Sequence, residues 1–159
     1  MSKMQNLYVG SAGQAAVMSE FLFRGYNVAV PEVDRGDDLF VVEDTNGSLS
    51  RIQVKAATGK IRKDGSYAAQ VNVGLKQLTT PQTPALTYVF VLRCGNRWCD
   101  FVVLSQSDLD MLRTNYGVGT KAGNSLVLTM RVTANTVACS KQDLNRYRNN
   151  FSSWPTIKH

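Results

Sequence analysis

The sequence predicts an α/β or α+β protein in which helices flank a mixed β-sheet. Three observations support this: an amphipathic segment near the N-terminus, a run of short apolar segments separated by turn residues, and further helix-forming segments near the C-terminus. The 159 residues fit one domain comfortably and two with difficulty, so we expect a single domain over 1–159. A hydrophobic fraction of 43% is enough to bury an ordinary core.

The first predicted helix spans 11–24. Ser11 can cap it, apolar residues follow at helical spacing, and Gly25 stands where a C-terminal glycine is expected. A short strand over 26–31 should follow and end at Pro31.

Two strands, 38–43 and 49–57, flank the dipeptide Asn46-Gly47, which is the strongest short hairpin signal because both residues tolerate positive φ. If these two residues form the loop, Thr45 pairs with Ser48, and the numbers of paired residues sum to 93. That register depends on the loop length, because a shift of one residue moves every side chain to the other face.

In this register Asp38 lies opposite Lys55, and Phe40 lies opposite Gln53. Because side chains alternate along a strand, Asp38, Gln53 and Lys55 point to one face. The other face receives an apolar set suited to packing on a helix: Leu39, Val41, Ile52 and Val54.

The rest of the chain is expected to add four strands and two helices. The strands are 66–73, which follows the basic segment 59–65, then 86–93 and 98–104 as a buried pair, and 126–132; the helices are 105–113 and 141–149. Trp154-Pro155 suggests that the C-terminal tail docks on the protein. Four strand aromatics are assigned to the core and not to a base-stacking platform: Tyr88, Phe90, Trp98 and Phe101.

Composition narrows the class of partner. A net charge of +6 and a pI near 9.4 favour an anionic partner, with nucleic acid first; no membrane partner is expected, because no basic amphipathic helix supports an anionic membrane surface. No apolar run is long enough to span a membrane, and residues 1–10 lack the features of a signal peptide, so we expect a cytoplasmic protein.

Three cysteines, Cys94, Cys99 and Cys139, are interpreted as reduced, partly buried thiols. The single histidine is the last residue, His159, which argues against structural zinc and against histidine acid–base chemistry.

The predicted trio suits metal-assisted phosphodiester cleavage. Asp38 can hold Mg²⁺ (Mn²⁺ can substitute), and the Gln53 carbonyl can supply a second oxygen ligand. Lys55 can orient the attacking water or stabilise negative charge in the transition state. Taken alone the pattern is weak, and a solvated strand edge is then the better interpretation.

A resemblance strengthens the functional interpretation. Four segments, 13–17 (GQAAV), 24–31 (RGYNVAVP), 37–39 (DDL) and 51–55 (RIQVK), resemble the PD-(D/E)XK nuclease superfamily. Within it they are most similar to the small bacterial and phage-type branch that includes a group-I-intron homing endonuclease and resolvase-like proteins. The resemblance covers the first half of the chain. It implies a restriction-endonuclease-like three-layer core, a Mg²⁺-dependent DNA endonuclease of homing, restriction or junction-resolving type, and a homo-oligomer.

Carried over by motif, the resemblance makes Asp38 the metal-binding aspartate and Lys55 the motif lysine. Gln53 stands where the superfamily usually has Glu or Asp, and Gln14 stands where relatives often have a helix Glu; Glu20, two turns further along, could substitute. These two amides keep a second interpretation open, a DNA-binding module of the same fold that has lost catalysis. A third is an interaction protein with an acidic protein partner.

Three basic residues after the second hairpin strand, Lys60, Arg62 and Lys63, are expected on a loop beside the cleft. They are interpreted equally well as phosphate contacts and as a solvated loop. The basic residues of the late helix, Lys141, Arg146 and Arg148, carry the same two interpretations, with solvation favoured.

Overall fold

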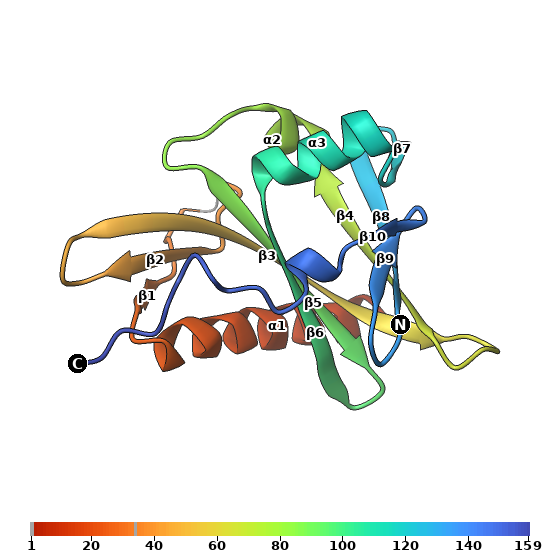
Figure 1. The fold of residues 1–159 in the computed structure, drawn as a ribbon, viewed down its shortest axis with the longest axis horizontal. Helices are drawn as coiled ribbons and strands as arrows, with labels where there is room; N and C mark the ends of the chain where they lie inside the picture. Colours follow the sequence, from red (N-terminus) through yellow and green to blue (C-terminus); the bar gives the residue numbers. More distant parts are fainter. Residues whose placement is uncertain (1, 34) are drawn as a thin grey trace.

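The fold consists of a mixed sheet with helices on both sides, as the sequence predicts. The computed structural model describes residues 2–33 and 35–159. Its elements in chain order are α1 (Lys3–Phe23), β1 (Asn27–Ala29), β2 (Leu39–Glu43), β3 (Ser48–Ile61), β4 (Tyr67–Gly74), α2 (Leu75–Thr79), β5 (Leu86–Cys94), β6 (Arg97–Ser105), α3 (Gln106–Tyr116), β7 (Thr120–Ala122), β8 (Ser125–Val132), β9 (Val137–Cys139), β10 (Gln142–Asp143) and a 3₁₀ helix, η1 (Asn145–Tyr147). Figure 1 shows α1 along one side of the strands, with α2 and α3 on the other.

The long strand β3 organises the sheet. β2 pairs antiparallel along one edge, and β5 pairs parallel along the other, from Arg51–Leu86 to Gly59–Cys94. β1 extends the sheet beyond β2, and β6 extends it beyond β5. β4 begins as the antiparallel partner of β3 and then continues into a second antiparallel region with β8, to which β7 and β9 add. The parallel β3–β5 pair, reached through β4 and α2, makes the sheet mixed.

Two hydrophobic cores lie on the two sides of β3 and β5. On one side Val17 and Phe21 of α1 pack on the predicted apolar set of the hairpin, which is buried (Leu39, Val41, Ile52 and Val54). Gly13 permits this approach, because a Cβ there would collide with the Cβ of Ala56. On the other side α3 packs with β4, β5 and β8, and this core includes Tyr88 and Phe90.

The aromatic and tail assignments are confirmed. Trp98 and Phe101 are half-buried and pack on the α1 core. In the tail, Trp154 is buried, its ring lies 5.2 Å from that of Phe21, and its indole Nε1 donates to Ser50 Oγ at 3.1 Å. Residues 106–116 form the helix predicted from 105, with the Ser105 side chain accepting from the Asp108 N–H at 3.0 Å.

The first helix begins earlier than predicted. It starts at Lys3, and Ser2 caps it in a reciprocal capping box with Gln5. Ser11 lies inside the helix, so its interpretation as the cap is wrong. Gly25 does follow the helix in the left-handed region, with φ of +87°.

The predicted two-residue hairpin loop is wrong. Glu43 pairs with Ser48, which leaves the four residues 44–47 in the loop, and paired residue numbers sum to 91. Gly47 takes positive φ (+72°) and Asn46 does not, so the tight turn that needs two positive φ values is not formed. Instead the Asn46 side chain accepts from the Ser48 N–H at 2.8 Å and closes the longer loop. Phe40 accordingly pairs with Arg51 and not with Gln53.

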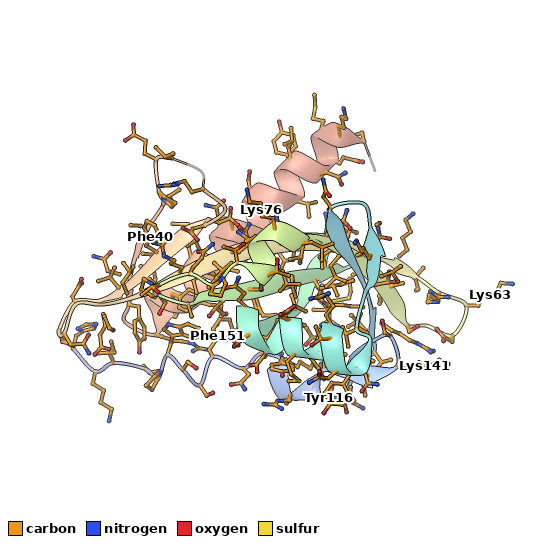
Figure 2. The ribbon with its side chains drawn as sticks, turned by 90° about the horizontal axis from the view of Figure 1, so that it is seen from above. Phe40, Lys63, Lys76, Tyr116, Lys141 and Phe151 are labelled. Carbon is orange, nitrogen blue, oxygen red and sulfur yellow. A yellow bond between two sulfur atoms is a disulfide. The ribbon has the colours of Figure 1, made fainter. Side chains whose placement is uncertain are left out.

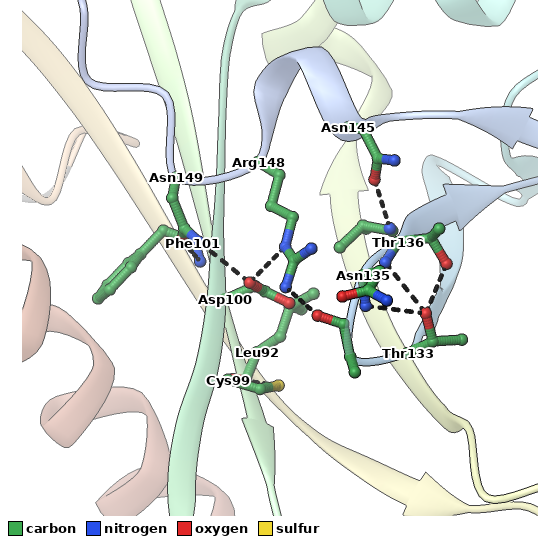
Figure 3. Close-up of polar contacts among 12 residues, drawn as sticks. Leu92, Cys99, Asp100, Phe101, Thr133, Asn135, Thr136, Asn145, Arg148 and Asn149 are labelled. Atoms are coloured by element: carbon green, nitrogen blue, oxygen red, sulfur yellow. Dashed lines mark hydrogen bonds and ion pairs between the residues drawn. The ribbon is translucent and has the colours of Figure 1, made fainter.

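The predicted helix over 141–149 is also wrong. Ser140 and Lys141 take positive φ (51° and 64°), which reverses the chain between β9 and the short β10, and η1 follows. Arg148 then pairs with the buried Asp100 at 2.7 Å, and Asn149 donates to the same carboxylate oxygen at 3.1 Å (Figure 3). Arg148 is therefore part of the packing of the C-terminal segment.

The cysteine interpretation is wrong for two of the three residues. Cys94 and Cys99 flank the β5–β6 turn with their Cα atoms 5.6 Å apart and form a disulfide. Cys139 is a buried free cysteine, as expected, and burial raises the pKa of its thiol. No helix in the part of the chain that the structure describes is long and apolar enough to cross a membrane.

Candidate functional site

Asp38 lies at an interrupted edge of β3. The ladder with β2 ends at Leu39–Ile52 and the ladder with β4 begins at Lys60–Ala68, so within the described ranges the edge between them has no strand partner. Asp38 occupies the start of this unpaired stretch of the β3 edge. The Asp38 N–H donates to the Ile52 carbonyl at 2.9 Å, and Asp38 Oδ2 accepts from the Val54 N–H at 2.7 Å. The carboxylate thus replaces a strand carbonyl and is held at the open edge.

Gln53 lies beside Asp38, as the sequence predicts, although the register differs. Its Nε2 donates to Asp38 Oδ2 at 2.6 Å, and its Oε1 accepts from Gln77 Nε2 at 3.2 Å. The amide group therefore presents N–H to the carboxylate. The predicted role of the Gln53 carbonyl as a metal ligand would require the amide to turn over.

A chain of hydrogen bonds sets the direction of this amide. Tyr88 is fully buried, and burial raises the pKa of its phenol, so the hydroxyl remains protonated and donates to Gln77 Oε1 at 3.1 Å. Gln77 must then present its amino group on the other side, where it donates to the Gly36 carbonyl at 2.6 Å and to Gln53. The order Tyr88 → Gln77 → Gln53 → Asp38 orients the carboxylate from the interior.

Neither Gln77 nor the tyrosine hydroxyl was predicted to belong to the site. Gln77 lies on α2, which has five residues, too few to show a helical period. Tyr88 was assigned to the core on its strand pattern, and that assignment is correct for its ring. The sequence offers only Gly74 before the short segment 75–79, and this pattern does not indicate a contact between Gln77 and Gln53.

If the site has the nuclease activity that the sequence predicts, replacing Gln77 with Leu is expected to lower it by roughly 10- to 100-fold, since Asp38 and Gln53 lose an orienting partner. Tyr88→Phe, which removes one link and keeps the ring, should have a smaller effect in the same direction. The measurement is single-turnover cleavage across a Mg²⁺ titration. A positioning role predicts that the Mg²⁺ concentration at half-maximal rate increases. The positioning role would be contradicted if the rate fell by the same factor at every Mg²⁺ concentration and in proportion to the loss of thermal stability.

Lys55 follows on the same strand and face, two residues beyond Gln53. It is half-buried, and its ammonium forms no hydrogen bond or ion pair within the described parts of the chain. A half-buried cation at an open strand edge can therefore meet a substrate anion. The predicted face-sharing of Asp38, Gln53 and Lys55 is retained, because the register differs from the predicted one by two and not by one.

Of the two helix candidates, one reaches the site. Gln14 is half-buried, and its Nε2 donates to the Asp38 carbonyl at 3.4 Å. Glu20 lies nearer the end of α1 and pairs with Arg24 at 3.4 Å. Asp37 is buried and pairs with Arg51 at 2.6 Å.

The three basic residues do not lie on a loop beside Asp38. Lys60 belongs to β3, about 17 Å along the strand from Lys55, and the turn follows at 62–65. Figure 2 shows Lys63 at the tip of this hairpin, at the opposite end of the molecule from Phe40. Lys60 and Arg62 instead line a groove of about 490 Å³ with Asn6 and Val9 of α1.

The donor set around Asp38 can be compared with the needs of a metal ion. Within residues 2–33 and 35–159 no group of three or more His, Cys, Asp or Glu side chains could hold one. Mg²⁺ is commonly bound by one or two carboxylates together with substrate phosphates and water. Asp38 fits this minimal requirement, and the three neighbouring amides (Gln14, Gln53 and Gln77) add no charge.

The mixed sheet with α1 across it defines a fold that is also found in a bacterial homing endonuclease. The solved structure of the bacterial homing endonuclease I-Ssp6803I is similar to this chain with a TM-score of 0.54, over 91% of this chain and 87% of that one, at 20% sequence identity. At this identity the likeness is one of fold. No protein-family model matches the chain, and no curated protein sequence matches it.

Proposed function

We propose that this protein is a metal-dependent DNA endonuclease that hydrolyses phosphodiester bonds at Asp38 and Lys55. One observation carries the proposal: the Asp38 carboxylate, which accepts from Gln53 and from the Val54 N–H, lies on the same face as Lys55, whose ammonium has no hydrogen bond or ion pair within residues 2–33 and 35–159. The net charge of +6 and the fold shared with a homing endonuclease support DNA as the substrate.

The roles follow from charge and placement. Asp38 is the group that would hold the metal, with Gln53 as a second ligand if its amide turns. When bound, Mg²⁺, or Mn²⁺ in its place, neutralises phosphate charge and makes a water molecule more acidic. Lys55 stabilises the negative charge that grows on the phosphate during attack. Gln14 and Gln53 hold Asp38 from two sides.

We also propose that the protein acts as a homo-oligomer, because one such site cuts one strand and a double-strand break needs two. The outer side of α1 supports this. Large apolar side chains are exposed near both ends of this helix: Met4, Leu7, Tyr8, Leu22 and Phe23. A helix that is apolar on both its inner and outer sides is usually covered on both.

A second candidate is a DNA-binding module of this fold without catalysis. The orientation of Gln53 favours it, because the amide N–H and not the carbonyl faces Asp38. One carboxylate without a second charged ligand binds a metal weakly.

Supercoiled plasmid and labelled duplex and junction DNAs, each with Mg²⁺, Mn²⁺ or EDTA, separate the two candidates. We expect cleavage that requires metal and falls by roughly 10²- to 10³-fold in Lys55→Met. Lys158→Met is the matched control, since it removes an exposed lysine of the C-terminal tail. DNA binding measured in EDTA should remain within about twofold in both variants. Binding without cleavage under every metal would select the second candidate, and cleavage that survives in Lys55→Met would place the reaction elsewhere.

A further inference from the structure

The outward side of β4 and β8 is mainly polar. Strand pairing sets Ala68 opposite Arg131, Gln70 opposite Thr129, Asn72 opposite Val127 and Gly74 opposite Ser125. The alternating residues Val71, Val73, Leu126, Leu128 and Met130 point into the α3 core and are buried. Gln70, Asn72 and Thr129 are exposed. We name this surface the β4–β8 face.

The strand residues of the β4–β8 face carry no negative charge. Among its eight strand residues and the adjoining Thr58 and Lys60 of β3 there is no aspartate or glutamate. At its rim Arg131 pairs with Asp64 of the β3–β4 turn. Small residues (Ala68, Gly74 and Ser125) lie at the two ends of the face, and a Cβ added at Gly74 would meet no atom within 4 Å. A rigid polymer could therefore lie directly on the strands.

This face joins the candidate site through a groove. β3 and β4 separate beyond Lys60–Ala68, and the groove of about 490 Å³ lies between them. Thr58, Gln70 and Thr129 line it together with Lys60 and Arg62. Thr58 Oγ1 is buried and has no hydrogen-bond partner in the described structure. The open β3 edge that carries Asp38 and Lys55 borders the same groove.

The chemistry of the β4–β8 face matches one nucleic-acid surface. The major groove of B-DNA admits a two-stranded β-ribbon, and side-chain amides of Asn and Gln pair with the N6 and N7 positions of adenine there. Hydroxyl groups contact any base edge. A-form RNA has a deep, narrow major groove that side chains do not read, so it does not fit a broad face of this kind.

We propose that the β4–β8 face binds in the major groove of duplex DNA and reads base edges through Gln70, Asn72 and Thr129. This rests on the proposed function for the choice of DNA, and it adds the substrate class and the residues that determine specificity. Lys60 and Arg62 contact the backbone that runs through the groove toward Lys55.

The test is a selection from a duplex library with a randomised centre, performed in EDTA so that no cleavage occurs. The full-length wild type is compared with Gln70→Ala, Asn72→Ala and Asn115→Ala. Asn115 is the matched control, an exposed amide on α3, the helix that packs on the buried side of these strands. The wild type should enrich a motif, and each of the first two variants should lose preference at one or two positions by about 10-fold. The control should select the wild-type motif.

A second arm identifies the groove. Replacing the adenines of the selected motif with 7-deazaadenine removes N7 and keeps base pairing, and it should weaken wild-type binding by about 10-fold. The proposal is overturned if all variants select one motif, if 7-deazaadenine has no effect, or if RNA of the same sequence binds as well as DNA. Plasmid cleavage scored on the same proteins keeps the two hypotheses apart. If the wild type cleaves DNA but the Gln70→Ala and Asn72→Ala variants select the wild-type motif, the β4–β8 inference is refuted and the proposed nuclease is not. If these variants select a changed motif but no protein cleaves DNA, the inference is supported and the nuclease is refuted.

Discussion

Replacing Asp38 with Asn is expected to reduce DNA cleavage by roughly 10³-fold or more and to leave the fold intact. The reason lies in how the carboxylate is held. Its Oδ2 atom accepts both the Val54 N–H and Gln53 Nε2, so the single carbonyl oxygen of Asn can take both hydrogen bonds. The substitution therefore removes the charge and keeps the connections of the open strand edge. Single-turnover cleavage in saturating Mg²⁺ measures the effect.

Asp38→Ala is the comparison that separates chemistry from structure. Alanine leaves the Val54 N–H and the buried Gln53 amide without an acceptor, which costs about 1–3 kcal/mol in the free energy of unfolding. We expect Asn and Ala to be equally inactive but unequal in urea unfolding, with Asn close to the wild type. Cleavage within tenfold of wild type in the Asn variant would show that the charge on Asp38 is not needed, and the proposed site would be wrong.

The grouping of Asp38, Gln53 and Lys55 could be predicted from the sequence for a reason that is partly fortunate. The Asn46-Gly47 hairpin signal gave the wrong loop length, and every predicted pair was displaced. The displacement was two residues, and side chains alternate with period two, so each residue kept its face. Strand patterning thus predicted which side chains share a surface, and turn chemistry did not predict the pairs.

Other features lay outside local patterns. β3 continues past its predicted end as far as Gly59 because β5, 35 residues away along the chain, pairs with it from Arg51 to Gly59, and Lys60 and Ile61 then pair with β4. Gln77 reaches Gln53 from a helix too short to show a period. The polar segment that begins at Lys141 has a helix-forming composition. It is not a helix, because Ser140 and Lys141 take positive φ and because Arg148 forms an ion pair with the buried Asp100. In each case a long-range contact overrides the local preference.

Replacing Arg148 with Met is expected to lower the free energy of unfolding by about 3–5 kcal/mol, because it leaves the Asp100 carboxylate buried without its ionic partner. The side chain of Asp100 is 2% exposed, and Arg148 Nε lies 2.7 Å from its Oδ1. The Asn149 side chain donates to the same Asp100 oxygen through Nδ2, and its Oδ1 accepts from the Phe101 N–H. Arg148 also donates to the Ala134 carbonyl at 2.8 Å. The C-terminal segment is tied to β6 through this carboxylate (Figure 3).

Urea unfolding measures the effect, and Arg113→Met is the matched control. Arg113 pairs with Asp110 at the same distance, 2.7 Å, but the two side chains are 32% and 36% exposed. The control should lose less than about 1 kcal/mol, because exposed ion pairs contribute little. The double variant Asp100→Asn/Arg148→Met should regain part of the loss, since the uncompensated charge is then removed. Equal losses for Arg148→Met and Arg113→Met would show that burial of Asp100 does not decide the strength of the pair.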